Sequence, residues 1–341
     1  MATEAQALHA ESIIIDSTCP LLEDDTHLGL YQRGGFTAVT PTVGGMHGGS
    51  AETLLRLAYW HRVIRERDDL VLVRTADDIR NAKKTGKTGL ILHFQGTEPL
   101  DRTVDLLDVY NALGVKVIQL TYNKRCHVGD GCEEPSDSGL SRYGKSVVKR
   151  MNDLGIIVDC SHTGVRTSLD AIDASTAPVI LSHANPKAVY SVHRNASDEL
   201  LRAIASSGGV IGIVGYPAFV SSDKRPTLDQ YIDHIAYLAD QVGIDHVGLG
   251  IDYFGGQHGI CPEDVALAAY ERKIALHIWS RETYPAPPYY YPEGIETPDK
   301  MLALTERMLA RGFSAAEVKQ VLGENWLNVY AKVWKDSGES K

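Results

Sequence analysis

The sequence predicts an α/β protein folded as a (β/α)8 TIM barrel. Eight short runs rich in valine, isoleucine and leucine recur along the 341 residues, and such runs are typical of strands buried on both faces of a parallel sheet. The runs are spaced widely enough for a crossover helix between consecutive strands. A doubly wound open sheet is the main alternative, but no Gly-x-Gly-x-x-Gly motif follows the first run, so the barrel is favoured.

The expected strands alternate with segments of helical periodicity. Residues 141–154 and 198–207 place apolar side chains at the spacing of one helix face, as expected for crossover helices that cover a barrel. A ninth apolar run at 70–73 is expected to form a short additional strand inside a long second crossover. The eight strands are expected at 12–16, 36–40, 89–94, 115–121, 155–160, 178–183, 209–215 and 246–252.

The C-terminal part differs in composition from the rest of the chain. Residues 279–295 (WSRETYPAPPYYYPEGI) are rich in proline and tyrosine, which excludes a regular helix or a central strand. This segment is either a packed structural loop or a functional one, namely a wall of the substrate site or a subunit contact. Residues 298–334 have helical periodicity, so we expect residues 1–341 to form a single barrel domain that a C-terminal helical segment closes.

The charge balance and the cysteine content limit the partners and the compartment. With 34 basic and 44 acidic side chains, the net charge of −10 has the wrong sign for binding phosphate backbones, so no nucleic-acid partner is expected. No apolar stretch approaches the ~18 residues of a membrane span, and the polar start resembles neither a signal nor a transit peptide. Five scattered cysteines favour a reduced, cytoplasmic setting. A cytoplasmic protein that acts on a small molecule is expected.

Polar side chains at the carboxyl ends of the expected strands are the candidate catalytic residues, because TIM barrels place their active sites there. His162 and His183 end two successive strands in similar Ser-His sequences, so their imidazoles are expected to lie close enough to share a metal ion. Each could instead be a hydrogen-bonded structural histidine. Asp252 lies at the end of the last strand, where it can bind metal, act as a general base or cap the following turn.

Other strand ends carry residues suited to ligand binding. Arg194 precedes an expected helix, and its planar guanidinium matches a carboxylate, although a surface ion pair is the common alternative. Tyr122 and Asn123 end another strand beside a basic cluster that can face an anionic ligand. Cys19 follows the first strand, where it is either a reactive thiolate or a buried, inert thiol.

Four ordered segments resemble the membrane (renal) dipeptidases of peptidase family M19, which are amidohydrolase-like, metal-dependent barrels. The segments are GLSRYGKSVVKRMNDLGIIVDCSH, VILSHANPKAVYSVHRNASDELLRAI, VGLGIDYFGG and LGENWLNVY. The resemblance runs through nearly the whole chain, between residues 12 and 334. It implies a (β/α)8 barrel that hydrolyses dipeptides with two zinc ions bridged by a glutamate, and a homodimeric assembly.

The resemblance also implies roles for individual residues. His162 and His183 match the two histidines that hold the second zinc ion. Asp252 matches the last-strand aspartate, which contacts the first metal and handles protons. Arg194 matches the arginine that binds the substrate carboxylate.

Several positions depart from the family pattern. The family's first strand ends in Asp-Gly-His-Asn-Asp, whereas residues 16–20 read Asp-Ser-Thr-Cys-Pro, so both ligands of the first zinc are replaced. The bridging glutamate corresponds to Gln95, whose neutral amide is a poor bridge between two cations. Tyr122 stands where the family has a substrate-contacting histidine. These replacements predict that the family's two-zinc site does not form.

We therefore expect a mononuclear hydrolase of a small dipeptide or N-substituted amino acid. One zinc ion is expected on His162 and His183, with Asp252, Gln95 or His93 completing its ligands. The alternatives are a barrel enzyme of another reaction class on a small carboxylate-bearing substrate, and a catalytically inactive binding protein. Ordinary dipeptides should be poor substrates, because losing one of two cations removes Lewis-acid stabilisation worth several kcal/mol.

Overall fold

Parallel strands close into a barrel in the computed structural model, which describes residues 3–45 and 48–334. The strands are β1 (Ile15–Cys19), β2 (Ala38–Gly45), β3 (Leu70–Leu72), β4 (Thr88–Leu90), β5 (Leu92–Gln95), β6 (Val115–Gln119), β7 (Ile157–Asp159), β8 (Val179–Ile180), β9 (Ile211–Ile213) and β10 (Val247–Leu249). Eight of them follow the order β8-β7-β6-β5-β2-β1-β10-β9, and a parallel bridge between Leu181 and Ile211 joins the two ends of this path. The predicted (β/α)8 barrel is confirmed.

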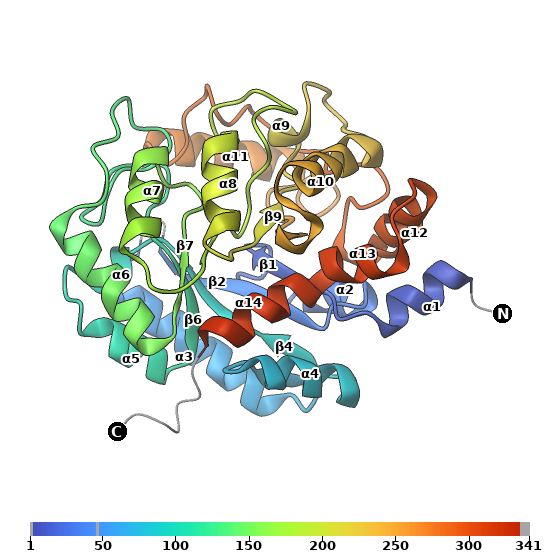
Figure 1. The fold of residues 1–341 in the computed structure, drawn as a ribbon, viewed down its shortest axis with the longest axis horizontal. Coiled ribbons are helices and arrows are strands. Elements are labelled where there is room, and N and C mark those ends of the chain that lie inside the picture. The colour runs from blue at the N-terminus through green and yellow to red at the C-terminus, as the bar shows by residue number, and fades with distance from the viewer. Residues whose placement is uncertain (1–2, 46–47, 335–341) are drawn as a thin grey trace.

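Helices surround the strands (Figure 1). None of the helices in residues 3–45 and 48–334 is long and apolar enough to cross a membrane. The α-helices are α1 (Glu4–Glu11), α2 (Leu28–Arg33), α3 (Ser50–Glu66), α4 (Ala76–Thr85), α5 (Leu106–Ala112), α6 (Arg142–Leu154), α7 (Val165–Ala174), α8 (Asp198–Ser206), α9 (Pro217–Val220), α10 (Leu228–Val242), α11 (Glu263–Ala275), α12 (Leu302–Ala310), α13 (Ala315–Lys319) and α14 (Asn325–Val333), with short helical turns η1 (Glu98–Leu100), η2 (Ile244–His246), η3 (Pro298–Lys300) and η4 (Gln320–Glu324).

The two predicted crossover helices begin and end where the sequence supplies caps. The Ser141 side chain accepts a hydrogen bond from the first turn of α6, and Gly155 ends that helix in a left-handed conformation. Ser197 caps α8 in the same way. The apolar stripe of α6, including Val147 and Met151, is buried against the barrel, as the helical periodicity predicts.

The third expected strand is interrupted. Ile91 separates β4 from β5, although its backbone N–H still donates to Val39 of β2 at 2.9 Å. β4 pairs with β2 and with β3, whereas β5 pairs with β2 and β6. The run at 70–73 thus forms the expected additional strand, β3. This strand pairs with β4, and both lie outside the eight-strand order of the barrel.

The C-terminal helix α14 closes the amino-terminal end of the barrel. Trp326 and Tyr330 are buried against residues at the starts of the strands, such as Ile15. The indole of Trp326 donates to the carbonyl of Leu249 at 3.0 Å, and Figure 1 shows α14 lying across the strands. Because this end is filled, the carboxyl ends of the strands are the open end of the barrel.

Candidate active site

A cavity of about 480 Å³, here called the barrel-mouth cavity, opens at the carboxyl ends of the strands. Gln95 ends β5, and Tyr122, His162 and Asp252 follow β6, β7 and β10; all four line this cavity. The volume is within the range of about 300–1,000 Å³ that is typical of small-molecule sites. Four predicted site residues from four strands therefore face one space, where barrels of this class place their active sites.

His162 and His183 meet at their Nε2 atoms, which lie 2.8 Å apart. They follow the neighbouring strands β7 and β8, which pair in parallel through Asp159 and Ile180. Burial, together with the charge of Arg194, lowers the pKa of both imidazoles well below the usual value. Both rings are therefore neutral at pH 7, each with one protonated nitrogen.

The protonated nitrogen of His162 is fixed by Asn123. The Nδ2 group of Asn123 donates to Tyr284 Oη at 3.0 Å and to the carbonyl of Ile278 at 3.4 Å, so its Oδ1 atom is the end that faces His162. That oxygen lies 2.6 Å from His162 Nδ1 and accepts a hydrogen bond from the protonated Nδ1 atom. The Nε2 atom of His162 consequently carries a lone pair.

The protonated nitrogen of His183 is fixed in the same way by Ser182. Burial alone would raise the pKa of the Asp159 carboxyl, but His93 and Ser182 bring it down to about 2. The Ser182 hydroxyl donates to this carboxylate at 2.5 Å, so it must accept from His183 Nδ1, 2.7 Å away. The Nε2 atom of His183 therefore also carries a lone pair.

Two neutral imidazoles thus direct lone pairs at each other. A proton or a cation between the Nε2 atoms removes the repulsion that this arrangement otherwise creates. Two imidazole nitrogens that share a tetrahedral zinc ion with bonds of ~2.0–2.1 Å are about 3.3 Å apart. The observed 2.8 Å needs only a small rotation of the rings to reach that spacing, so the pair fits one ion.

The described chain supplies few other ligands for an ion. Within residues 3–45 and 48–334, no three His, Cys, Asp or Glu side chains are grouped closely enough to hold a metal, so Asp252 does not complete a ligand set here. Gln95 lines the cavity, and its Nε2 atom donates to Thr18 Oγ1 at 3.2 Å. The side chains at positions 18 and 95 therefore bond to each other through neutral groups.

Asp252 combines an unusual backbone conformation with a shifted carboxyl pKa. Its backbone is left-handed, with φ of 63°, and its carbonyl accepts a hydrogen bond from the Tyr291 hydroxyl. Burial raises the pKa of its carboxyl to about 7, with Asp16 raising it further and Arg194 opposing the shift. A carboxyl with this pKa can both accept and donate a proton near neutral pH.

An aromatic wall borders the histidine side of the barrel-mouth cavity. Residues 279–295 form neither helix nor strand, as predicted, and Trp279 and Tyr284 from this segment line the cavity. Their rings stack at 4.5 Å with an interplanar angle of 6°. The Trp279 indole donates to Tyr122 Oη at 3.0 Å, and the Tyr122 ring stacks on His162 at 4.3 Å. The proline-rich segment therefore forms a wall next to the imidazole pair.

Other predicted residues lie near this cavity without lining it. Arg194 lines a neighbouring cavity of about 520 Å³ that His162 also lines, and its guanidinium donates to the His183 carbonyl at 2.8 Å. Asn123 is fully buried behind His162. Cys19 is also fully buried, and burial raises the pKa of its thiol well above the usual value. Cys19 is therefore the inert thiol of the two alternatives.

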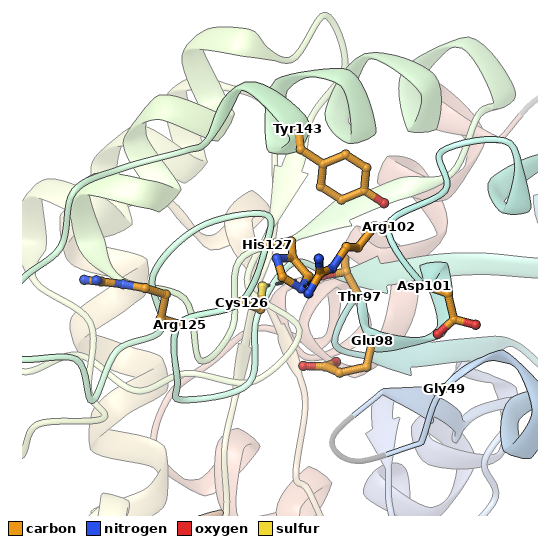
Figure 2. A pocket seen from close by; sticks show the side chains of 9 residues that line it. All are labelled: Gly49, Thr97, Glu98, Asp101, Arg102, Arg125, Cys126, His127 and Tyr143. Carbon is orange, nitrogen blue, oxygen red and sulfur yellow. Dashed lines mark hydrogen bonds between the residues drawn. The ribbon is translucent and has the colours of Figure 1, made fainter.

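A third cavity, of about 730 Å³, lies away from these residues, between the loops that follow β5 and β6 (Figure 2). Its Arg102 donates to His127 Nε2 at 2.7 Å. Figure 2 shows the Arg125 side chain directed away from the other labelled side chains, and Arg125 is ion-paired with Asp130. None of the predicted site residues lines this cavity, which is bounded by Gly49, Thr97, Glu98, Asp101, Arg102, Arg125, Cys126, His127 and Tyr143.

Sequence reasoning missed the residues that orient the site. Asp159 and Ser182 fix the proton on His183, and their places in the strand-end sequences Asp-Cys-Ser-His and Leu-Ser-His are the signal that could have identified them. Lys273 on α11 also lines the barrel-mouth cavity. No motif marks it, because a lysine in a charged helix usually faces solvent.

Comparisons with known proteins identify relatives of this chain. The chain is 27% identical to the dipeptidase tcpJ of Claviceps purpurea over 291 residues, which are 84% of this chain and 61% of the relative. It is 34% identical to an uncharacterised dipeptidase of Schizosaccharomyces pombe over 224 residues, which are 61% of this chain and 52% of the relative. The chain thus spans less than two thirds of the length of these two relatives.

A solved structure extends the similarity to the full chain. The amidohydrolase from Pseudomonas aeruginosa superposes with a TM-score of 0.88 and 33% sequence identity, covering 98% of this chain and 100% of that one. The family described as membrane dipeptidase (peptidase family M19) matches residues 31–268, more than two thirds of the 341 residues. The chain therefore belongs to peptidase family M19, the membrane dipeptidase family.

Proposed function

We propose that this chain is a metallohydrolase that cleaves an amide-type C–N bond in a small dipeptide or N-substituted amino acid. The observation that carries the proposal is the pair of Nε2 atoms 2.8 Å apart, each left with a lone pair by the hydrogen bond at its Nδ1 atom. Membership of family M19 supports the reaction class. The volume of the barrel-mouth cavity suits a small-molecule substrate.

His162 and His183 are the proposed ligands of a single divalent cation, with zinc the ion that two neutral imidazoles and the family favour. Such an ion activates water and polarises a carbonyl, which is the chemistry that amide hydrolysis needs. The remaining ligand positions fall to water or substrate, to the Gln95 carbonyl, or to Asp252 after a side-chain movement, since both residues line the same cavity as His162.

Asp252 is the proposed proton-transfer residue, because its carboxyl faces the cavity with a pKa raised by burial to about 7. It can accept a proton from the attacking water and return it to the leaving amine. Tyr122 contributes its ring and hydroxyl to the surface that contacts substrate. Asn123 is a positioning residue that acts through His162.

A catalytically inactive binding protein is the second candidate. The observation that favours it is the lack of a third His, Cys, Asp or Glu ligand beside the imidazole pair in the described part of the chain, since catalytic zinc sites usually have three protein ligands. Such a protein would use the same cavity to hold its ligand.

Hydrolysis assays on the zinc-loaded protein distinguish the two candidates. We expect turnover of N-acyl amino acids or selected dipeptides by the wild type, and losses of about 10²–10⁴-fold in kcat for Asp252→Asn. His162→Ala and His183→Ala should abolish turnover. His246→Ala is the matched control, because its imidazole bonds to the Gly209 carbonyl at the closed end of the barrel. Ligand binding without turnover of any substrate in the panel supports the binding protein instead.

A further inference from the structure

Lys273 lines the barrel-mouth cavity and forms no salt bridge among the residues that the structure describes. It lies on α11 and lines the cavity together with His162 and Asp252. None of the ion pairs in residues 3–45 and 48–334 includes Lys273, although Glu23 and Asp252 are near enough to influence its pKa. Burial lowers that pKa to about 8, against the opposing effect of both carboxylates. The ammonium therefore remains mostly charged at pH 7.

The ammonium is held by aromatic rings. Its Nζ atom lies over the ring of Trp279, 3.9 Å from the centroid, and 5.4 Å from the centroid of Phe254. Stacking on Tyr284 holds the Trp279 ring in place. Such cation–π contacts orient a lysine without neutralising it. A positioned ammonium that forms no salt bridge among the described residues, in a ligand-sized cavity, is a site for an anionic group.

The same rings connect Lys273 to the imidazole pair. The Trp279 indole, under the ammonium, donates to Tyr122 Oη, and the Tyr122 ring stacks on His162. Phe254 and Tyr216 also line the cavity, and their rings lie 5.8 Å apart. The aromatic wall thus extends from the charged nitrogen of Lys273 to the ring of His162.

Two other cations lie near this cavity. Arg56 lines it but is paired with Glu52 at 3.4 Å. Arg194 does not line it: it lines the neighbouring cavity, where its guanidinium donates to the His183 carbonyl and its buried Nε atom has no hydrogen-bond partner among the described residues. Lys273 is the cation that both faces the barrel-mouth cavity and lacks an ion pair among the described residues.

We propose that Lys273 binds the carboxylate of the substrate in the barrel-mouth cavity, and that the aromatic wall binds an apolar or aromatic side chain next to that carboxylate. This inference rests on the proposed function for the position of the cleaved bond, which would lie at the His162 and Asp252 end of the cavity. The substrate class is accordingly N-acyl or N-aminoacyl derivatives of apolar and aromatic amino acids with a free carboxylate. Water does not fully screen the partly buried ammonium of Lys273. Its salt bridge with the substrate carboxylate therefore discriminates strongly against neutral analogues.

Binding of two matched probes tests the carboxylate site without requiring turnover. N-acetyl-L-phenylalanine carries the carboxylate, and N-acetyl-L-phenylalaninamide is its neutral counterpart; their dissociation constants are measured by calorimetry on the full chain. We expect the wild type to prefer the carboxylate by about tenfold or more, corresponding to at least ~1.4 kcal/mol. Lys273→Met should remove this preference and leave amide binding within about twofold, whereas Lys273→Arg should retain it.

A matched control and a competing variant complete the experiment. Arg272→Met removes one positive charge from the exposed side of the same helix and should leave the preference unchanged. Arg194→Gln tests the alternative that the family resemblance implies, in which Arg194 binds the substrate carboxylate; we expect this variant to keep the preference. The inference is overturned if wild type shows no carboxylate preference, if Lys273→Met keeps it, or if Arg194→Gln alone removes it. Carboxylate selectivity without hydrolysis refutes only the proposed function, and hydrolysis with an unaltered KM in Lys273→Met refutes only this inference.

Discussion

The hydrogen bond from His162 to Asn123 provides a sharp test of how the imidazole pair is organised. Asn123→Leu keeps the side-chain volume and removes the 2.6 Å acceptor of His162 Nδ1. The ring is then free to change its protonated nitrogen and its orientation. Loss of such an outer hydrogen bond lowers metal affinity about 10–100-fold, or ~1.4–2.7 kcal/mol. It also leaves Tyr284 without one of its partners, which should reduce stability by about 1–3 kcal/mol.

Zinc affinity is measured by competition with a chelator, and stability by urea unfolding of the metal-free protein. Asn185→Leu is the matched control: Asn185 is fully buried, its Nδ2 group donates to the carbonyls of Val214 and Phe219, and neither hydrogen bond involves an imidazole of the pair. The control should lose stability and keep its zinc affinity. A folded Asn123→Leu protein that binds zinc within about twofold of wild type would refute the reasoning.

Three further predictions concern stability and specificity. Burial raises the pKa of the Asp16 carboxyl from 3.8 to about 7, so its contribution to stability is complete below about pH 4 and is lost as the pH rises toward 7. Asp16→Asn should therefore gain stability relative to wild type between pH 4 and 8, by up to about 4 kcal/mol in urea unfolding, and a constant difference over this range would contradict the assignment. Trp326→Ala should cost about 3–5 kcal/mol of unfolding free energy, because the ring fills the closed end of the barrel; a loss below ~1 kcal/mol would show that α14 does not close it. Plain L,L-dipeptides with small side chains should be hydrolysed on the order of a thousandfold more slowly than two-zinc enzymes achieve, and a kcat/KM above about 10⁴ M⁻¹s⁻¹ would show that a single ion suffices.

The barrel could be predicted from the sequence because its strands are buried on both faces. A buried parallel strand needs apolar residues at nearly every position, and this composition marks each run in the chain. The break at Ile91 could not be predicted, because the residues on either side of it are apolar and only the pairing of β4 with β3 and of β5 with β6 divides the run. The non-helical segment 279–295 was predictable from its prolines.

The site was predictable only where it follows the strand ends. His162, Gln95, Tyr122 and Asp252 reach one cavity because parallel strands bring their carboxyl ends together. The placement of Asn123 behind His162 depends on Tyr284, which is 161 residues away in sequence. Lys273 depends on how α11 packs over the opening. Neither long-range contact leaves a local pattern in the chain.

The metal content of the protein tests the central claim, a single ion on the imidazole pair. Elemental analysis is made on wild type, His162→Ala, His183→Ala and the control His246→Ala after zinc loading and removal of free metal. We predict one zinc equivalent per chain in wild type and in the control, and none in His162→Ala or His183→Ala, because both Nε2 atoms are needed to hold the ion. Two equivalents in wild type, no bound zinc, or one equivalent retained in either site variant would contradict the account.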